Sequence, residues 1–187
     1  MRIRGAGVRS LLLAIESVHG PEKLAAVKGA VPKHVRDQVD HVLPVQWYDV
    51  EVSASLQVAV RDVIGGGKWD ESHRIGVEAA RIDFSGLYRV FVRAVSYETI
   101  WDRAPRIWTQ YNSQGSAEWT DRREGYAVGR IRGAAGYNMG LWESVAGRIE
   151  GMLQMTGLKT ASVKALLFRA RKRLASLLQD DAVEKSS

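Results

Sequence analysis

The chain has 187 residues, of which 45% are hydrophobic and 26% charged, a composition typical of a globular protein rather than a disordered one. It contains no cysteine, which excludes disulfides and thiolate chemistry, and its longest apolar run, LLLAI, is too short to cross a bilayer. The formal net charge is +6, equal to the six basic residues and no acidic ones between residues 159 and 178, so the rest of the chain is neutral.

Helical patterns dominate the chain from Gly7 to about Ser113. Apolar residues recur at spacings of three and four in residues 8–18, 32–42 and 49–64, which predicts amphipathic helices there. Pro21 follows a glycine and favours a new helix start. The three glycines at 65–67 predict a helix end rather than a phosphate loop, because no strand precedes them and no Lys-Ser/Thr pair follows.

The pattern changes after Gly115. SAEWTDRREGYAVGRIRG alternates polar and apolar residues on either side of Arg-Glu-Gly, which predicts an antiparallel hairpin. A helix then returns in NMGLWESVAGRIEGMLQMTG. Its apolar stripe consists of Leu141, Val145, Ile149 and Leu153.

Several phrases together resemble a known family. GPEKL, LPVQWYDV, GLYRVFVRAVSYETIWDRAPRIWTQYNSQG and YNMGLWESVAGRIEGML resemble a family of paralogous myxobacterial proteins with no assigned function. That family is similar in turn to the superfamily of haem–nitric-oxide sensor domains, V4R ligand-binding domains and TRAPP subunits. The resemblance implies an α+β domain over residues 1–158, a helical bundle with a small late antiparallel sheet, often dimeric.

Haem is not expected as a cofactor, and no other cofactor is expected either. Haem-binding relatives carry Tyr-x-Ser-x-Arg in the late hairpin; here YAVGR supplies Tyr126 and Arg130, but Val128 replaces the serine. The relatives also need an axial histidine on the preceding helix, where this chain has none.

Catalytic and metal sites are not predicted. No nucleophile-elbow or paired-carboxylate pattern stands out, so we expect a protein that is not an enzyme. His34, Asp37 and His41 would share one face of a helix and suggest a weak divalent-metal site, but a solvated helix face is the preferred interpretation and no metal is predicted.

The basic segment at residues 159–179 has two interpretations. As a helix it carries Val163, Leu167, Ala170, Leu174 and Leu177 on one stripe, and it resembles a sigma-factor region 4 recognition helix; a strand followed by a short helix also fits. Residues 180–187 are expected to be a disordered tail. The candidate nucleic-acid-binding residues are Lys164, Arg169, Arg171, Lys172 and Arg173.

The preferred hypothesis is a non-catalytic cytoplasmic sensory or scaffolding module without a transmembrane segment. Its partners would be another protein or a second copy, and its interior could hold a small apolar ligand. The alternative is a DNA-binding transcriptional regulator that uses residues 159–178. The aromatic and basic residues predicted around a ligand pocket are Trp101, Trp108, Tyr111, Tyr126, Arg130 and Trp142.

Overall fold

The computed structural model describes residues 1–84, 97–123 and 126–155. Of residues 97–101, 103–104, 122–123 and 126–127 only the backbone is described. The elements within these ranges are β1 (Arg2–Arg4), α1 (Gly5–His19), α2 (Pro21–Ala30), α3 (Lys33–Val39), β2 (Trp47–Asp49), α4 (Val50–Val63), α5 (Asp70–Asp83), α7 (Tyr97–Tyr111), β3 (Ser116–Arg123), β4 (Tyr126–Arg132) and α8 (Met139–Met155).

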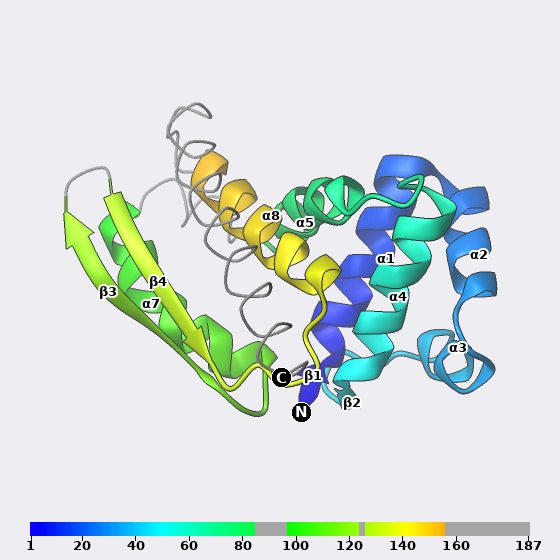
Figure 1. The fold of residues 1–187 in the computed structure, drawn as a ribbon, viewed down its shortest axis with the longest axis horizontal. Coiled ribbons are helices and arrows are strands. Elements are labelled where there is room, and N and C mark those ends of the chain that lie inside the picture. Colours follow the sequence, from blue (N-terminus) through cyan, green and yellow to red (C-terminus); the bar gives the residue numbers. More distant parts are fainter. Residues whose placement is uncertain (85–96, 124–125, 156–187) are drawn as a thin grey trace, which may run out of the picture.

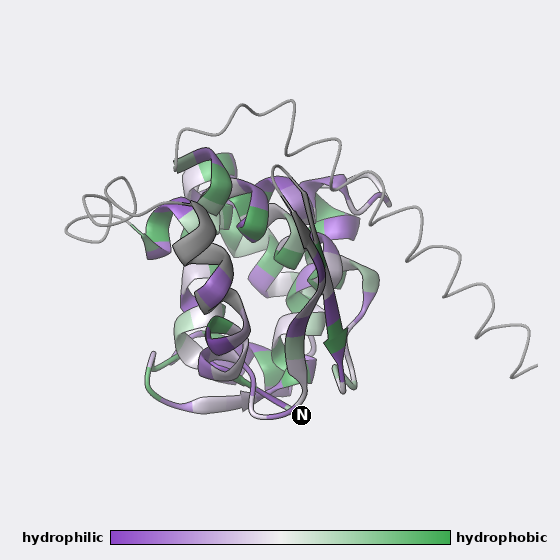
Figure 2. Cartoon of the chain, turned by 90° about the vertical axis from the view of Figure 1, so that its left-hand side faces the viewer, coloured by the Kyte–Doolittle hydropathy of each residue, from purple (hydrophilic) through white to green (hydrophobic). Residues whose placement is uncertain are grey.

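The described part of the chain is an α+β fold of helices with two small antiparallel sheets, as predicted at this level. In Figure 1 the β3–β4 hairpin and α7 stand on one side, the helices α1 to α5 on the other, and α8 runs between them. Figure 2 shows hydrophilic and hydrophobic residues along the same helices, as amphipathic elements require. The predicted segments 159–179 and 180–187 lie outside the described residues.

The main core lies among α1 to α5. Val8, Ile15, Leu56 and Ile75 are fully buried there, and they come from the apolar faces of α1, α4 and α5. Helix α1 ends before Gly20, whose φ of 85° interrupts the helix and is a backbone conformation that glycine adopts without strain. At the start of α4 the Asp49 carboxylate accepts a hydrogen bond from the Glu51 amide at 2.9 Å.

The late hairpin is confirmed as β3 paired antiparallel with β4. Trp119 lies opposite Gly129 and Ala117 opposite Ile131, with an irregularity between Trp119 and Asp121. Because neighbouring residues of a strand point to opposite faces, these four residues share one face of the ribbon. A Cβ at Gly129 would lie 2.8 Å from the Trp119 ring, so the glycine leaves room for the indole to lie across the sheet.

A second small sheet was not predicted. Trp47–Asp49 pairs antiparallel with Arg2–Arg4, and Ile3 also bridges Asn112 at the end of α7. This sheet therefore ties the N-terminus to the end of α7. Strands of three residues give too short an alternation to recognise in a sequence.

Helices α5 and α8 approach each other closely, because glycines of α8 face the backbone of α5. A Cβ at Gly151 would lie 2.6 Å from the Val77 carbonyl oxygen and 3.0 Å from the Ala80 Cβ. Gly147 likewise faces the backbone of His73 and Val77, with a Cβ 3.0 Å from the Val77 nitrogen. One face of α8 thus packs against α5, and the opposite face is available to contact another element.

Candidate functional site

A cavity of about 330 Å³ lies between the helical bundle and the unit formed by α7 and the hairpin. Its walls come from α1, α4, α5, α7, α8 and both strands of the hairpin. Most of its lining is apolar, and its volume falls in the range of small-molecule sites.

The predicted apolar stripe of α8 forms one wall. Leu141, Val145, Ile149 and Leu153 all line the cavity. The opposite side of the helix carries Gly147 and packs against α5. Residues four apart lie above one another on a helix, so a single stripe supplies a continuous apolar surface along the cavity.

The hairpin and α7 form the facing wall. Ala117, Trp119 and Ile131 line it from the inner face of the ribbon, and Trp108 and Tyr111 line it from the last turn of α7. The Trp108 indole donates a hydrogen bond to the Gln114 carbonyl oxygen at 3.2 Å, which fixes the ring and leaves its apolar face for the cavity.

Tyr137 lines the cavity beside Trp108. Its hydroxyl donates to the Asn112 side-chain oxygen at 2.9 Å, and its ring centroid lies 5.6 Å from that of Trp108. Burial raises the pKa of Tyr137 to about 12, so the phenol is neutral at physiological pH.

One polar cluster at the cavity joins three helices. Arg148 on α8 donates hydrogen bonds to Asp83 on α5, to the Ser10 hydroxyl at 2.8 Å and to the Gly7 carbonyl oxygen at 3.2 Å on α1. Burial raises the pKa of Asp83 above its usual value of 3.8, while the charge of Arg148 acts in the opposite direction. Burial and the nearby Asp83 charge also raise the pKa of Tyr111.

Another polar residue at the cavity is Gln57 on α4. Its side chain is completely buried and lines the cavity, yet neither its amide nitrogen nor its amide oxygen has a hydrogen-bond partner in the structure. Neither Gln57 nor Arg148 was predicted from the sequence as a site residue. For Gln57 a signal existed, because Ser53 and Gln57 recur with Leu56 and Val60 on the buried side of α4.

The structure brings only some of the predicted pocket residues together. Trp108 and Tyr111 line the cavity, and Arg130 contributes to its rim although its side chain is exposed. Trp142 packs against Tyr137 at a centroid distance of 4.9 Å and does not itself line the cavity. The side chains of Trp101 and Tyr126 lie outside the described part, as do the basic residues from Lys164 to Arg173.

The suggested metal-binding face at His34, Asp37 and His41 is not formed. Helix α3 ends at Val39, so His41 lies beyond it, and its ring nitrogen contacts the Asp37 carbonyl oxygen at 3.1 Å. His34 instead contacts Glu51 at 3.1 Å. Across the residues that the structure describes, no group of three or more potential ligands is placed to hold a metal ion.

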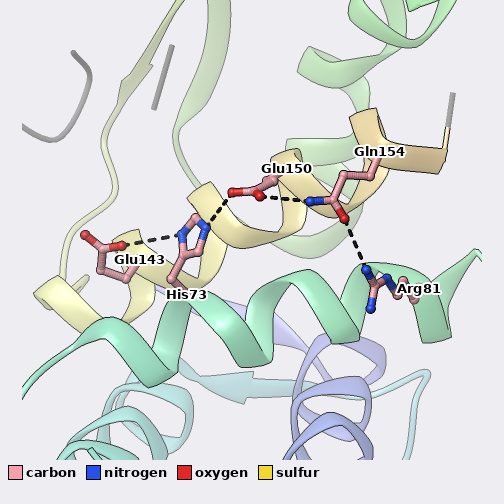
Figure 3. A network of polar contacts seen from close by, with 5 residues as sticks. All are labelled: His73, Arg81, Glu143, Glu150 and Gln154. Atoms are coloured by element: carbon pink, nitrogen blue, oxygen red, sulfur yellow. Dashed lines mark hydrogen bonds and ion pairs between the residues drawn. The ribbon is translucent and has the colours of Figure 1, made fainter. Parts of the chain in front are cut away.

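A further polar network lies on the α5–α8 interface, away from the cavity (Figure 3). The Nε2 of His73 lies 2.8 Å from Glu150, and its Nδ1 lies 3.5 Å from Glu143, an ion-pair distance. Glu150 also accepts from Gln154, whose oxygen accepts from Arg81 at 3.1 Å. The network links the two helices along their line of contact.

No protein-family model matches the chain, and comparisons with curated proteins and with solved structures also find no match. Among the described residues, no helix has the length and apolarity needed to cross a membrane.

Proposed function

We propose that the protein is a non-catalytic sensory or scaffolding module that binds a small apolar ligand in the cavity between the bundle and the hairpin. The observation that carries the proposal is the cavity itself, with about 330 Å³ of space and an apolar wall along α8. Binding sites of this kind combine apolar walls with a few polar groups that fix orientation.

The polar groups at the cavity favour binding over catalysis. Arg148 is engaged by Asp83, Ser10 and Gly7, and no histidine or lysine is among the described residues of the lining. General acid–base catalysis usually relies on a group that titrates near neutral pH and reaches the substrate.

A cytoplasmic location and a protein partner or homodimer belong to the same proposal. They are supported by the lack of cysteine and by the family resemblance, respectively. Sedimentation of the purified protein tests for a homodimer: a monomer at all concentrations would contradict it.

Ligand binding can be tested with the fluorescent probe N-phenyl-1-naphthylamine, which brightens in apolar sites. Val145→Trp fills the cavity from α8, whereas Val58→Trp places the same side chain on the exposed face of α4. We expect the wild type and Val58→Trp to enhance the probe fluorescence and Val145→Trp to lose the enhancement. Equal enhancement by all three proteins would reject the cavity as the site, provided that circular dichroism shows both variants folded.

DNA binding is a second candidate function, favoured by the charge distribution of the sequence. Six basic residues and no acidic one between 159 and 178 would contact phosphates, and the affinity for duplex DNA would fall steeply with salt. The experiment is a duplex titration at two salt concentrations. Binding abolished by Arg171→Glu with Arg173→Glu supports this function, and no binding at low salt rejects it.

A further inference from the structure

We propose that the Gln57 side chain hydrogen-bonds to the head group of the cavity ligand. This head group is neutral and has both a hydrogen-bond donor and an acceptor, as in an aliphatic carboxamide. This inference rests on the proposed function, because it describes how the same cavity selects its ligand. The ligand class is a small apolar molecule with an uncharged amide head, and an aliphatic carboxamide represents it.

The buried state of Gln57 is the first observation. The side chain has 0% exposure, and both its amide atoms lack a partner in the structure. An unpaired buried amide is costly, and the great majority of buried polar side-chain atoms are hydrogen-bonded. The amide offers two donors and an acceptor, so a carboxamide ligand could both accept from its nitrogen and donate to its oxygen.

Helix packing holds this amide in place. Gln57 lies on the buried side of α4 with Leu56 and Val60, a position where an apolar residue would serve packing better. Gly140 of α8 approaches it so closely that a Cβ there would lie 2.6 Å from the Gln57 Cβ. The side chain is therefore sealed under the first turn of α8 and reaches the cavity beside Ser53 and Leu141. A polar residue that breaks the packing pattern of its own helix is typical of a functional site.

The charges around the cavity argue for a neutral head. Arg148 is a half-buried cation that lines the cavity, and its guanidinium is already bound to Asp83, Ser10 and Gly7. A carboxylate head buried beside Gln57 would thus meet only a cation that is already paired, because Arg130, the other cation among the described lining residues, lies at the rim with an exposed side chain, and the carboxylate would share the cavity with Asp83. Burying an uncompensated charge is far more costly than burying a neutral amide.

The cavity volume sets the length of the chain. At the roughly 30 Å³ that one water occupies in the liquid, 330 Å³ holds about eleven non-hydrogen atoms. Decanamide has about this size, and methyl decanoate and decanoate differ from it mainly in the head. Methyl decanoate has no hydrogen-bond donor, and decanoate is charged.

The experiment measures how well each of these three compounds displaces N-phenyl-1-naphthylamine from the wild type, from Gln57→Met and from Gln110→Met. Methionine keeps the length of glutamine without its hydrogen bonds, and Gln110 is an exposed residue of α7 that serves as the matched control. We expect the wild type and Gln110→Met to bind decanamide about ten-fold more tightly than methyl decanoate, the size of effect that one unpaired buried group produces. In Gln57→Met the preference should disappear, and decanoate should bind most weakly to all three proteins.

Each contrary result has a distinct meaning. Equal affinity of the wild type for decanamide and methyl decanoate would overturn the inference, because the Gln57 amide would then hydrogen-bond to water rather than to the ligand. Equal weakening of all three compounds by Gln57→Met would also overturn it and assign the residue a packing role, and tighter binding of decanoate would assign the head group to Arg148. If the probe itself does not bind the wild type, the proposed function fails together with the inference.

Discussion

The close contact between α5 and α8 predicts opposite effects of the same substitution at two helical glycines. Gly151 is buried in α8, where an added Cβ would lie 2.6 Å from the Val77 carbonyl oxygen. Gly29 is exposed in α2, with nothing within 4 Å of the position of a Cβ. Both residues are helical, so alanine removes the same conformational freedom from the unfolded chain at each site.

The expected magnitudes follow from these distances. To restore ordinary contact of 3.4 Å at Gly151, the helices would have to separate locally by about 0.8 Å. Overpacking of this kind costs about 1–3 kcal/mol, and the higher helix propensity of alanine returns up to about 1 kcal/mol. We therefore expect Gly151→Ala to lower the free energy of unfolding by about 1–2 kcal/mol, and Gly29→Ala to raise it by about 0.5–1 kcal/mol.

Urea denaturation followed by circular dichroism measures both changes under one set of conditions. With a slope of about 2 kcal/mol per molar urea, the midpoint should fall by about 0.5–1 M for Gly151→Ala. The slope itself should stay unchanged in both variants. A Gly151→Ala protein as stable as the wild type would show that α5 and α8 do not pack at this distance, and the account of α8 as a helix with one glycine face would be wrong.

Three further predictions concern the polar groups of the cavity. Because burial raises the pKa of Asp83 above its usual 3.8, the contribution of Asp83 to stability is full at lower pH and declines as the pH rises through the folded-state pKa. Asp83→Asn should remove this decline in a pH series of urea titrations, and an unchanged pH dependence would contradict the prediction. Because burial raises the pKa of Tyr137 to about 12, this phenol should ionise well above the usual value of 10 in an ultraviolet titration, and stability should fall as the pH rises between those two values. Tyr137→Phe should remove this late ionisation, and its persistence in the variant would assign it to another tyrosine. Without ligand, Gln57→Met should raise the free energy of unfolding by about 1–2 kcal/mol, since it removes an unpaired buried amide, and a loss of stability would mean that the amide is bonded.

The regular elements could largely be predicted from the sequence. Apolar spacing located α1, α4 and α8, and alternation around Arg-Glu-Gly located the hairpin, because each of these patterns is long enough to be distinctive. The sheet between β1 and β2 was missed for the opposite reason. Its strands have three residues each and are separated by more than forty residues, so their pairing depends on tertiary structure rather than on local pattern.

The candidate site was only partly predictable. The stripe from Leu141 to Leu153 and the aromatic residues Trp108 and Tyr111 are recognisable as apolar residues that need a neighbour, and they line the cavity. Gln57 shares the apolar side of α4 with Leu56 and Val60, which is a signal of burial, whereas no such signal exists for Arg148, because a charged residue within a helix is interpreted as solvent-facing. Their burial depends on how closely α8 approaches α4 and α5, which glycine spacing alone does not reveal.

Glycine packing on α8 also explains the position of His73. Glu143 and Glu150 lie seven residues apart, two turns along one side of α8, and Gly147 falls midway between them. Because Gly147 carries no side chain, the backbone of His73 can approach α8 at that point, and its ring then lies between the two carboxylates, with Nε2 2.8 Å from Glu150 and Nδ1 3.5 Å from Glu143. The same contact turns the stripe from Leu141 to Leu153 away from α5 and toward the hairpin, so the glycines that join α5 to α8 also create the apolar wall of the cavity.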